Sequence, residues 1–270
     1  MNKYSLSVTL RKLGLIQLAD KLRFYFIFIT SYKLRRKFFK DNPNAKLPPA
    51  YYIYETFNLN YHVFYNESIE TAEWVVSFLK KYATLKNSNI LDWGCGPGRV
   101  IRHLPNLMDK SCHFHGTDYN KSYIEWCKKN IPDVTFSSNQ LTPPLEYKDN
   151  TFDIIYGISI FTHLSEEMHF AWFNELIRVS KPGGILFLTL QGNIYRDKLT
   201  AEEKRNFDKG ELVIKSKTKE GHRTYSAFQP AIFVKELIGE NEILEHVEGK
   251  IKDGKYQQDL WIIKVKTQVE

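Results

Sequence analysis

The segment ILDWGCGPGRV, at residues 90–100, places three glycines within five positions, directly after a short apolar run that ends in an aspartate. The apolar run predicts a buried strand, and the glycines predict a tight turn that leads into a helix. A turn without side chains lets a ligand approach the backbone, and the free N–H groups at the start of a helix make that turn electron-poor. We therefore expect residues 92–98 to hold a ligand.

The order of the predicted elements defines the fold class. Strands are predicted at 90–92, 112–118, 134–139, 152–159 and 185–190, with weaker strand patterns at 211–216, 242–248 and 258–265. Helical patterns lie before the first strand at 70–82, between the first and second, second and third, and fourth and fifth strands, and near 230–239. This alternation predicts an α/β, Rossmann-like fold: a mostly parallel seven-stranded sheet with helices on both faces.

Local signals fix the ends of three of these helices. The first is expected to begin near Gly98 and to end around Pro105. Asn120 caps the second, which runs through Lys129. The third follows Ser165 and ends at KPGG, residues 181–184, because proline and glycine interrupt a helix.

Charge divides the 270 residues into two parts. Residues 1–41 contain ten Lys or Arg and two Asp, whereas the remainder contains 28 basic and 29 acidic residues. We therefore predict a basic, aromatic-rich helical arm and cap at residues 1–66, and the α/β domain at residues 67–270. Seven aromatics at 51–65 favour a packed core, with closure over a ligand as the alternative.

The basic arm has three possible partners. Only nine uncharged residues separate Arg23 from Lys33, far fewer than the roughly 20 needed to span a bilayer. We favour a helix docked on the main domain or on a partner subunit. The alternative is a basic amphipathic segment in peripheral contact with an anionic membrane through residues 1–41. Nucleic acid fits the apolar runs poorly, and the oligomeric state is not indicated.

The three cysteines indicate the compartment. Cys95, Cys112 and Cys127 have neither the density of a disulfide scaffold nor the paired spacing of a zinc site. We expect no metal site and a cytoplasmic location.

The spacing of the glycines limits the ligand. Dinucleotide sites use G-x-G-x-x-G, whereas here the glycines are Gly94, Gly96 and Gly98. Asp92 would repel a pyrophosphate and suits a ligand that carries positive charge, such as S-adenosylmethionine. DWGCGPG matches every fixed position of [D/E]-x-G-x-G-x-G, so residues 68–265 resemble the class I S-adenosylmethionine-dependent methyltransferases. The resemblance implies that Asp92 holds the methionine end and that Gly94, Cys95, Gly96 and Gly98 form the cofactor turn.

Two further strand ends extend the predicted cofactor site. Asp118 closes the second strand, where its carboxylate can accept both ribose hydroxyls, with Tyr119 beside it; helix capping is the alternative role. The resemblance implies that Asn139, or the backbone of Gln140, binds the adenine amino group after the third strand. A local role in the turn is the alternative for Asn139.

His163 is the candidate catalytic residue. It follows the fourth strand, at the carboxyl edge where open α/β sheets bind ligands. Methyl transfer to an alcohol requires a base near neutral pKa, and several small-molecule methyltransferases resemble this segment and place a histidine there. The alternative is a histidine that caps the next helix or shapes the loop.

Two features of the sequence bear on the acceptor of the methyl group: the end of the fourth strand, and two segments that resemble a subgroup of methyltransferases. YGIS at 156–159 does not resemble the [N/D]-P-P-[Y/F] motif of enzymes that methylate base amines or the glutamine amide. SIFTHLSEEMHFAWFNELIRVSKPGG and QDLWII resemble bacterial methyltransferases associated with surface-glycan synthesis. This resemblance implies a hydroxyl of a sugar or other small molecule as acceptor. The alternatives are a nicotinamide-dependent oxidoreductase and a non-catalytic cofactor-binding scaffold that recruits partners through the arm.

Overall fold

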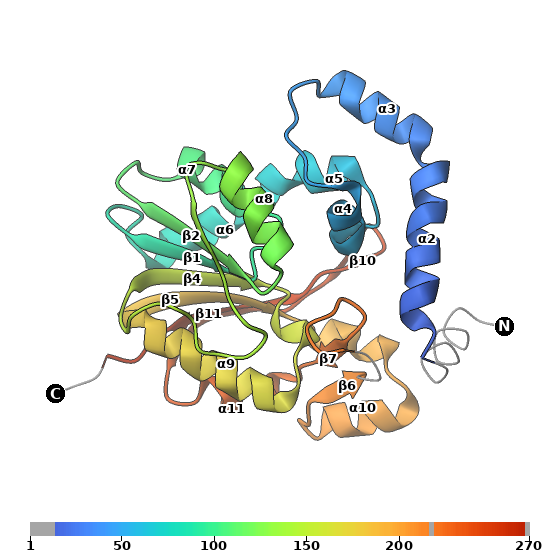
Figure 1. Cartoon of the computed structure of the whole chain (residues 1–270). Helices are drawn as coiled ribbons and strands as arrows, with labels where there is room; N and C mark the ends of the chain where they lie inside the picture. Colours follow the sequence, from blue (N-terminus) through green and yellow to red (C-terminus); the bar gives the residue numbers. More distant parts are fainter. Residues whose placement is uncertain (1–13, 216–218, 268–270) are drawn as a thin grey trace.

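The computed structural model describes residues 14–215 and 219–267. Its centre is a seven-stranded sheet in the order β3-β2-β1-β4-β5-β11-β8 (Figure 1). The first five of these strands are parallel, and β11 is antiparallel to both β5 and β8. The predicted Rossmann-like sheet is confirmed. The strands are β1 (Asn89–Trp93), β2 (His113–Asp118), β3 (Thr135–Ser138), β4 (Phe152–Ile158), β5 (Ser180–Leu190), β8 (Glu242–Val247) and β11 (Asp259–Lys264).

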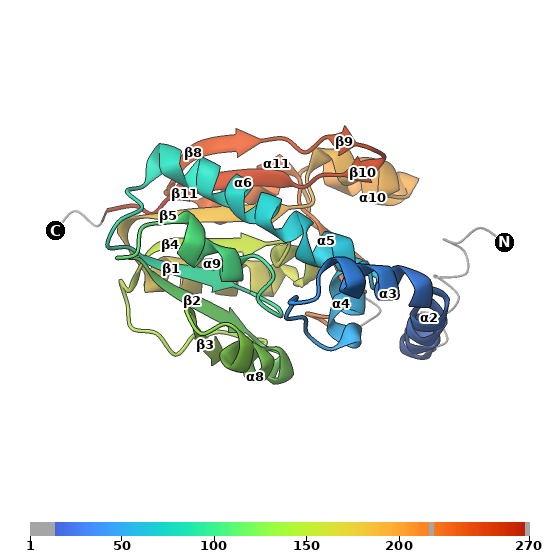
Figure 2. The same cartoon turned by 90° about the horizontal axis from the view of Figure 1, so that it is seen from above.

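Helices cover both faces of the sheet (Figures 1 and 2). Successive side chains of a strand point to opposite faces, so Ile90 joins the core under α6 and α8, while Leu91 and Trp93 join the core under α9 and α11. Ser165 begins α9 by accepting a hydrogen bond from the N–H of Met168. The helices are α6 (Glu67–Tyr82), α7 (Leu104–Leu107), α8 (Lys121–Asn130), α9 (Glu166–Val179), α10 (Ala201–Asp208) and α11 (Ala231–Ile238).

Three predicted elements differ from the structure. The helix expected from Gly98 to Pro105 is instead a turn, a 3-10 helix (η1, Ile101–His103) and the single-turn α7, because a proline without an N–H cannot continue a helix. The third helix ends at Val179, directly before KPGG as predicted, but the strand expected at 185–190 begins earlier, at Ser180, so β5 includes residues 181–184. The strand expected at 211–216 is β6 (Val213–Lys215), which pairs with β7 (Ser226–Phe228) outside the main sheet.

The remaining elements are short, and they include two more 3-10 helices. They are η2 (Phe161–His163), η3 (Asn193–Lys198), β9 (Ile251–Lys252) and β10 (Lys255–Tyr256).

The N-terminal arm forms a separate small core. Its helices are α2 (Ile16–Thr30), α3 (Tyr32–Asp41), α4 (Ala50–Phe57) and α5 (Tyr61–Tyr65). Tyr54, Tyr61 and Phe64 are buried there, which supports the core interpretation of the aromatic cluster. The Asp20 carboxylate on α2 accepts from the Tyr54 hydroxyl and forms an ion pair with Arg223 of the main domain. Among the described residues, no helix has the length and hydropathy needed to cross a bilayer.

Candidate cofactor site

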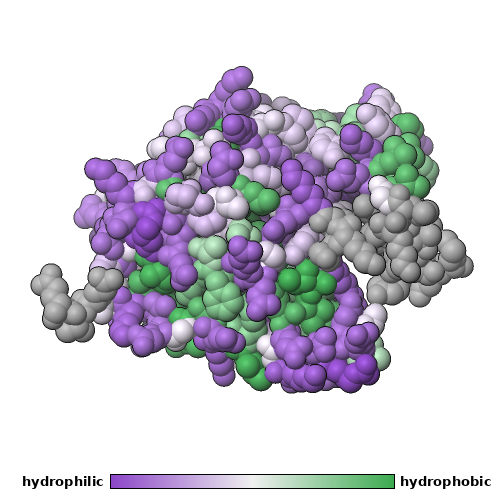
Figure 3. Space-filling model, turned by 60° about the horizontal axis from the view of Figure 1, so that its bottom comes forward, coloured by the Kyte–Doolittle hydropathy of each residue, from purple (hydrophilic) through white to green (hydrophobic). Residues whose placement is uncertain are grey.

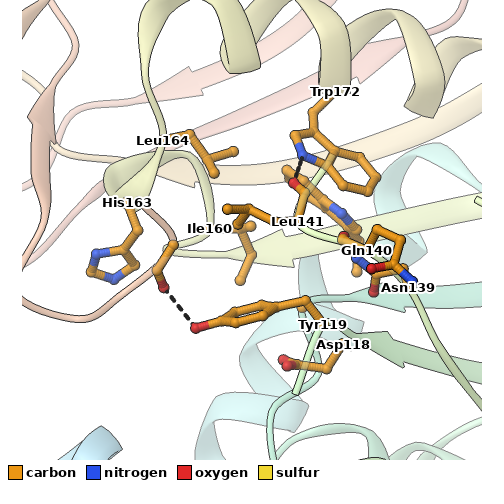
Figure 4. Close-up of a pocket in the computed structure, with 12 residues that line it drawn as sticks. Asp118, Tyr119, Asn139, Gln140, Leu141, Ile160, His163, Leu164 and Trp172 are labelled. Carbon is orange, nitrogen blue, oxygen red and sulfur yellow. Dashed lines mark hydrogen bonds between the residues drawn. The ribbon is translucent and has the colours of Figure 1, made fainter. Parts of the chain in front are cut away.

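A cavity lies at the carboxyl edge of the parallel strands, where β1, β2, β3 and β4 all end. Six of the ten predicted site residues line it: Gly94, Asp118, Tyr119, Asn139, Gln140 and His163. Figure 4 shows Asp118 and Tyr119 on one side of this cavity and Leu141, Ile160 and Trp172 on the other. The parallel sheet therefore brings residues from four separate strand ends to one place.

The glycine turn combines a tight backbone with open space. Gly94, Gly96 and Gly98 have φ values of +75°, +54° and +68°, which residues other than glycine rarely adopt. A Cβ on Gly94 would lie 2.2 Å from Cδ1 of Ile160, and one on Gly98 would lie 2.5 Å from Cδ1 of Ile131. A Cβ on Gly96 would meet nothing within 4 Å. Gly96 does not line the cavity itself, but it is the position of the turn at which the bare backbone faces free space.

The turn is attached to the end of β2. The N–H groups of Gly94 and Cys95 donate to the carbonyl oxygen of Thr117 at 2.8 and 2.9 Å. The Cys95 side chain is buried beside Gly116, and Gly98 packs against α8 and its C-terminal end, so neither lines the cavity. Cys95 and Gly98 therefore pack the turn against the rest of the protein and do not face the cavity.

Asp118 is held in a fixed orientation. Its Oδ2 accepts from the N–H of Gly96 at 2.9 Å, and its Oδ1 accepts from the N–H of Asn120 at 2.8 Å. Asn120 itself caps α8, since its side chain accepts from the N–H of Ser122. A carboxylate has about four acceptor positions, so two remain for a ligand in the adjoining cavity.

Asp92 lies buried behind the turn, and it does not line the cavity. Burial raises the pKa of its carboxyl to about 7; the nearby Tyr156 hydroxyl lowers that pKa, the charge of Asp118 raises it, and Arg99 lowers it. Burial likewise raises the pKa of Asp118 to about 6, although the Asn120 and Gly96 N–H groups oppose the shift. The two carboxylates therefore favour a ligand that brings positive charge and hydrogen-bond donors.

These pKa values predict that cofactor affinity depends on pH. A cationic ligand binds the deprotonated carboxylates, and their pKa values lie near 6 and 7 before binding. Protons compete below those values, so the affinity for S-adenosylmethionine is expected to fall by up to about tenfold per pH unit between pH 7 and 6, and by up to about 100-fold per pH unit below pH 6, where both carboxyls are protonated. Titration calorimetry from pH 8 to 5 measures this slope. Asp92→Asn removes one of the two groups and should make the slope shallower; an affinity independent of pH would contradict the assignment.

Residues after β3 form the far wall of the cavity. The Asn139 Oδ1 accepts from the Thr117 hydroxyl at 2.9 Å, and the indole N–H of Trp172 donates to the carbonyl oxygen of Leu141 at 2.9 Å. The Asn139 side chain therefore makes a local contact in the turn and also lines the cavity. Gln140 is exposed at the rim of the cavity.

His163 lies at the edge of this cavity, in η2. Its Nδ1 is 2.8 Å from the carbonyl oxygen of Tyr225, which can only accept, so Nδ1 carries the proton and Nε2 keeps its lone pair. Burial lowers the pKa of His163, and the ring is neutral at pH 7. In Figure 4 the ring points away from Asp118 and Tyr119.

Two residues of the cavity, and one close to Asp118 that does not line the cavity, were not predicted from the sequence. Ile160 lies over Gly94, and Gly221 accepts a hydrogen bond from the Tyr119 hydroxyl at 3.0 Å although 102 positions separate the two. Glu55 of α4 accepts a hydrogen bond from Tyr123, and its charge raises the pKa of Asp118. The aromatic cluster at residues 51–65 was the one signal in the sequence that the arm could lie close to the ligand site.

A second cavity, of about 560 Å³, lies within the arm, between α3 and the connection from α4 to α5. Arg35, Lys37, Phe38 and Leu59 are among its lining residues. It contains none of the predicted site residues.

The sheet order, the open glycine turn after β1 and the anchored carboxylate at the end of β2 define a Rossmann-like, nucleoside-binding class of protein. Residues 90–184 match the methyltransferase domain family. A SAM-dependent methyltransferase from Methanosarcina mazei shares the fold, with a TM-score of 0.56, 20% identity, and coverage of 71% of this chain and 98% of that one. Residues 90–184 thus match a methyltransferase domain, the fold is that of an S-adenosylmethionine-dependent methyltransferase, and this similarity indicates S-adenosylmethionine as the cofactor.

Curated relatives are similar over part of their length. A tRNA (carboxymethyluridine(34)-5-O)-methyltransferase from Arabidopsis thaliana is 31% identical over 126 residues, which are 46% of this chain and 29% of that protein. A malonyl-[acyl-carrier protein] O-methyltransferase from Bacillus anthracis is 28% identical over 182 residues, 63% of this chain and 62% of that protein. The chain thus spans less than two thirds of either relative.

Proposed function

We propose that the protein transfers a methyl group from S-adenosylmethionine to an oxygen of its acceptor, a hydroxyl of a sugar or other small molecule. The observation that carries this proposal is the pair of buried carboxylates, Asp92 and Asp118, on either side of an open glycine turn. The three buried thiols, which form no disulfide, are compatible with the cytoplasm.

The residues of the cavity fit the parts of the cofactor. The two free acceptor positions of Asp118 suit the ribose hydroxyls, and the open space at Gly96 leaves room for the adjoining chain. Ile160, Leu141 and the Tyr119 ring offer an apolar slot for the adenine. Asp92 supplies negative charge near the methionine end.

Two features of the sequence favour an oxygen acceptor. YGIS, at 156–159, stands where enzymes that methylate the amines of bases or the glutamine amide have their typical motif. The aligned relatives are compatible with oxygen but do not select it, because two are named as O-methyltransferases and others as an N- and a C-methyltransferase. The resemblance to methyltransferases of surface-glycan synthesis makes a glycan the acceptor that we test first.

The cofactor supplies a methyl group on a cationic sulfur, and an acceptor oxygen displaces the sulfur in line. Catalysis by this chain then consists mainly of alignment and exclusion of water. We propose that Nε2 of His163 accepts the proton of the acceptor hydroxyl. The bond from Nδ1 to Tyr225 fixes the tautomer that leaves Nε2 available.

His163→Asn separates this role from a structural one. The Asn amide N–H can replace Nδ1 as the donor to Tyr225, but Asn cannot act as a base. Both His163→Asn and His163→Ala are therefore expected to lower kcat by about 100-fold or more, with cofactor Kd unchanged. A His163→Asn variant with normal kcat alongside an impaired His163→Ala variant would assign the residue to loop structure instead.

Two assays test the proposed function against its alternatives. Isothermal titration should show binding of S-adenosylmethionine and its demethylated product, and no heat with nicotinamide dinucleotides; the reverse result would identify an oxidoreductase. Transfer of a labelled methyl group into cell extract, with and without glycosidase treatment, should give glycosidase-sensitive label. Cofactor binding without any labelled product would identify a non-catalytic scaffold.

A further inference from the structure

Helix α2 has two apolar faces, and only one of them is packed. Phe24, Ile27 and Phe28 face the core of the arm, where the Phe24 ring lies 5.1 Å from Tyr51 and 5.3 Å from Tyr54. The other face, which we name the α2 stripe, consists of side chains that are between 44 and 71% exposed. The α2 stripe comprises Leu15, Leu18, Leu22, Tyr25, Phe26 and Ile29.

The spacing of the stripe is that of a single helix face. Apart from the adjacent pair Tyr25 and Phe26, successive members lie three or four positions apart from Leu15 to Ile29, so they align along α2 and the residue that precedes it. Hydrophobic side chains show on the side of the molecule where α2 stands (Figure 3). Fifteen helical residues extend for about 22 Å. Exposed apolar area of this length marks an interaction surface.

Positive charge borders the α2 stripe. Lys21 and Arg23 lie on opposite sides of it, about 100° around the helix from Leu22. On α3, the exposed basic residues are Lys33, Arg36, Lys37 and Lys40. The Asp20 carboxylate of α2 is directed inward, to Tyr54 and Arg223, so it does not offset this charge at the stripe.

We propose that the α2 stripe lies in the headgroup region of an anionic lipid bilayer, with the basic residues of α2 and α3 on the lipid phosphates. An apolar helix face flanked by Lys and Arg is the pattern of interfacial helices, and each basic residue near an anionic surface strengthens binding. A second copy of the chain is a poorer occupant, because its arm would bring the same positive charge against this one.

Membrane contact through α2 would also determine where the cofactor cavity lies relative to the membrane. The ion pair between Asp20 and Arg223 ties α2 to the segment that includes Gly221, a residue of the cavity wall. A membrane-bound α2 therefore fixes the cavity at the membrane surface. The proposed lipid contact itself does not depend on the identity of the acceptor.

Vesicle binding by the full chain tests this proposal. The chain is expected to sediment with vesicles of phosphatidylcholine mixed with phosphatidylglycerol, weakly with phosphatidylcholine alone, and less as salt is added. The triple variant Leu22→Ser, Phe26→Ser, Ile29→Ser should bind at least about tenfold more weakly. The matched control is Ile232→Ser, Ile251→Ser, which removes exposed apolar residues elsewhere and should bind normally.

A charge variant keeps the test valid whatever the triple variant does to folding. Lys21→Glu, Arg23→Glu leaves the apolar residues in place and should weaken binding to the anionic vesicles by about fivefold or more per residue. Failure of the unmodified chain to bind anionic vesicles would overturn the proposal. So would a dimer in light scattering that the triple variant converts to a monomer, because the stripe would then be a subunit interface.

Discussion

Asp118→Ala is expected to weaken the binding of S-adenosylmethionine by more than about 100-fold. The carboxylate offers two acceptor positions to the ribose hydroxyls, and charge-assisted hydrogen bonds contribute about 1.5–3 kcal/mol each. The same substitution removes the acceptor for the N–H groups of Gly96 and Asn120, so the turn also loses its anchor. Two such bonds correspond to about 3 kcal/mol or more, which is over 100-fold in Kd.

Titration calorimetry with the demethylated cofactor measures this loss. Asp133→Ala, at an exposed carboxylate, is the matched control and should bind normally. Asp118→Asn should be intermediate, because the amide keeps one acceptor oxygen and replaces the other with a donor. An unchanged Kd for Asp118→Ala would mean that the ribose lies elsewhere.

Gly96→Ala has the second large expected effect, a loss of cofactor affinity of at least about tenfold at a small cost in stability. A Cβ at this position meets no protein atom within 4 Å, so it would project into the open space in which we place the methionine chain of the cofactor. The backbone penalty for a non-glycine residue at φ +54° is about 1–2 kcal/mol.

Gly183→Ala provides a matched control for this substitution. Gly183 has φ +77°, its Cβ would also meet nothing within 4 Å, and it lies near the start of β5, at the opposite edge of the sheet. Both variants should lose similar thermal stability, while only Gly96→Ala should lose cofactor binding. Equal affinities in calorimetry would show that the open space at Gly96 is not used by the cofactor.

The sequence predicted the central features of the fold because they depend on local patterns. Short apolar runs identified the strands of the parallel sheet, and Asp92 and Asp118 were located as acids at the ends of the first two strands. Local patterns failed where tertiary pairing decides the structure. Residues 181–184 follow the end of α9 as predicted, but they also extend β5 by pairing, and the residues at 213–215 pair with β7 instead of joining the main sheet.

The residues that reach the site from distant parts of the sequence were harder to predict than the glycine turn and Asp118. The glycine turn and Asp118 are encoded within 30 residues, whereas Gly221 and Glu55 reach the site from distant loops and from the arm. No spacing in the sequence links such segments. The position of His163 after β4 was predictable, but the direction of its ring depends on the carbonyl oxygen of Tyr225, 62 positions away.

A crystal structure of the chain with the demethylated cofactor would locate the nucleoside directly. We expect it in the cavity of Figure 4, with its ribose hydroxyls donating to Asp118 and its amino-acid tail passing Gly96 on the side of Asp92. A nucleoside bound away from the turn, with Asp118 making no contact to it, would show that Asp118 and the glycine turn do not hold the cofactor.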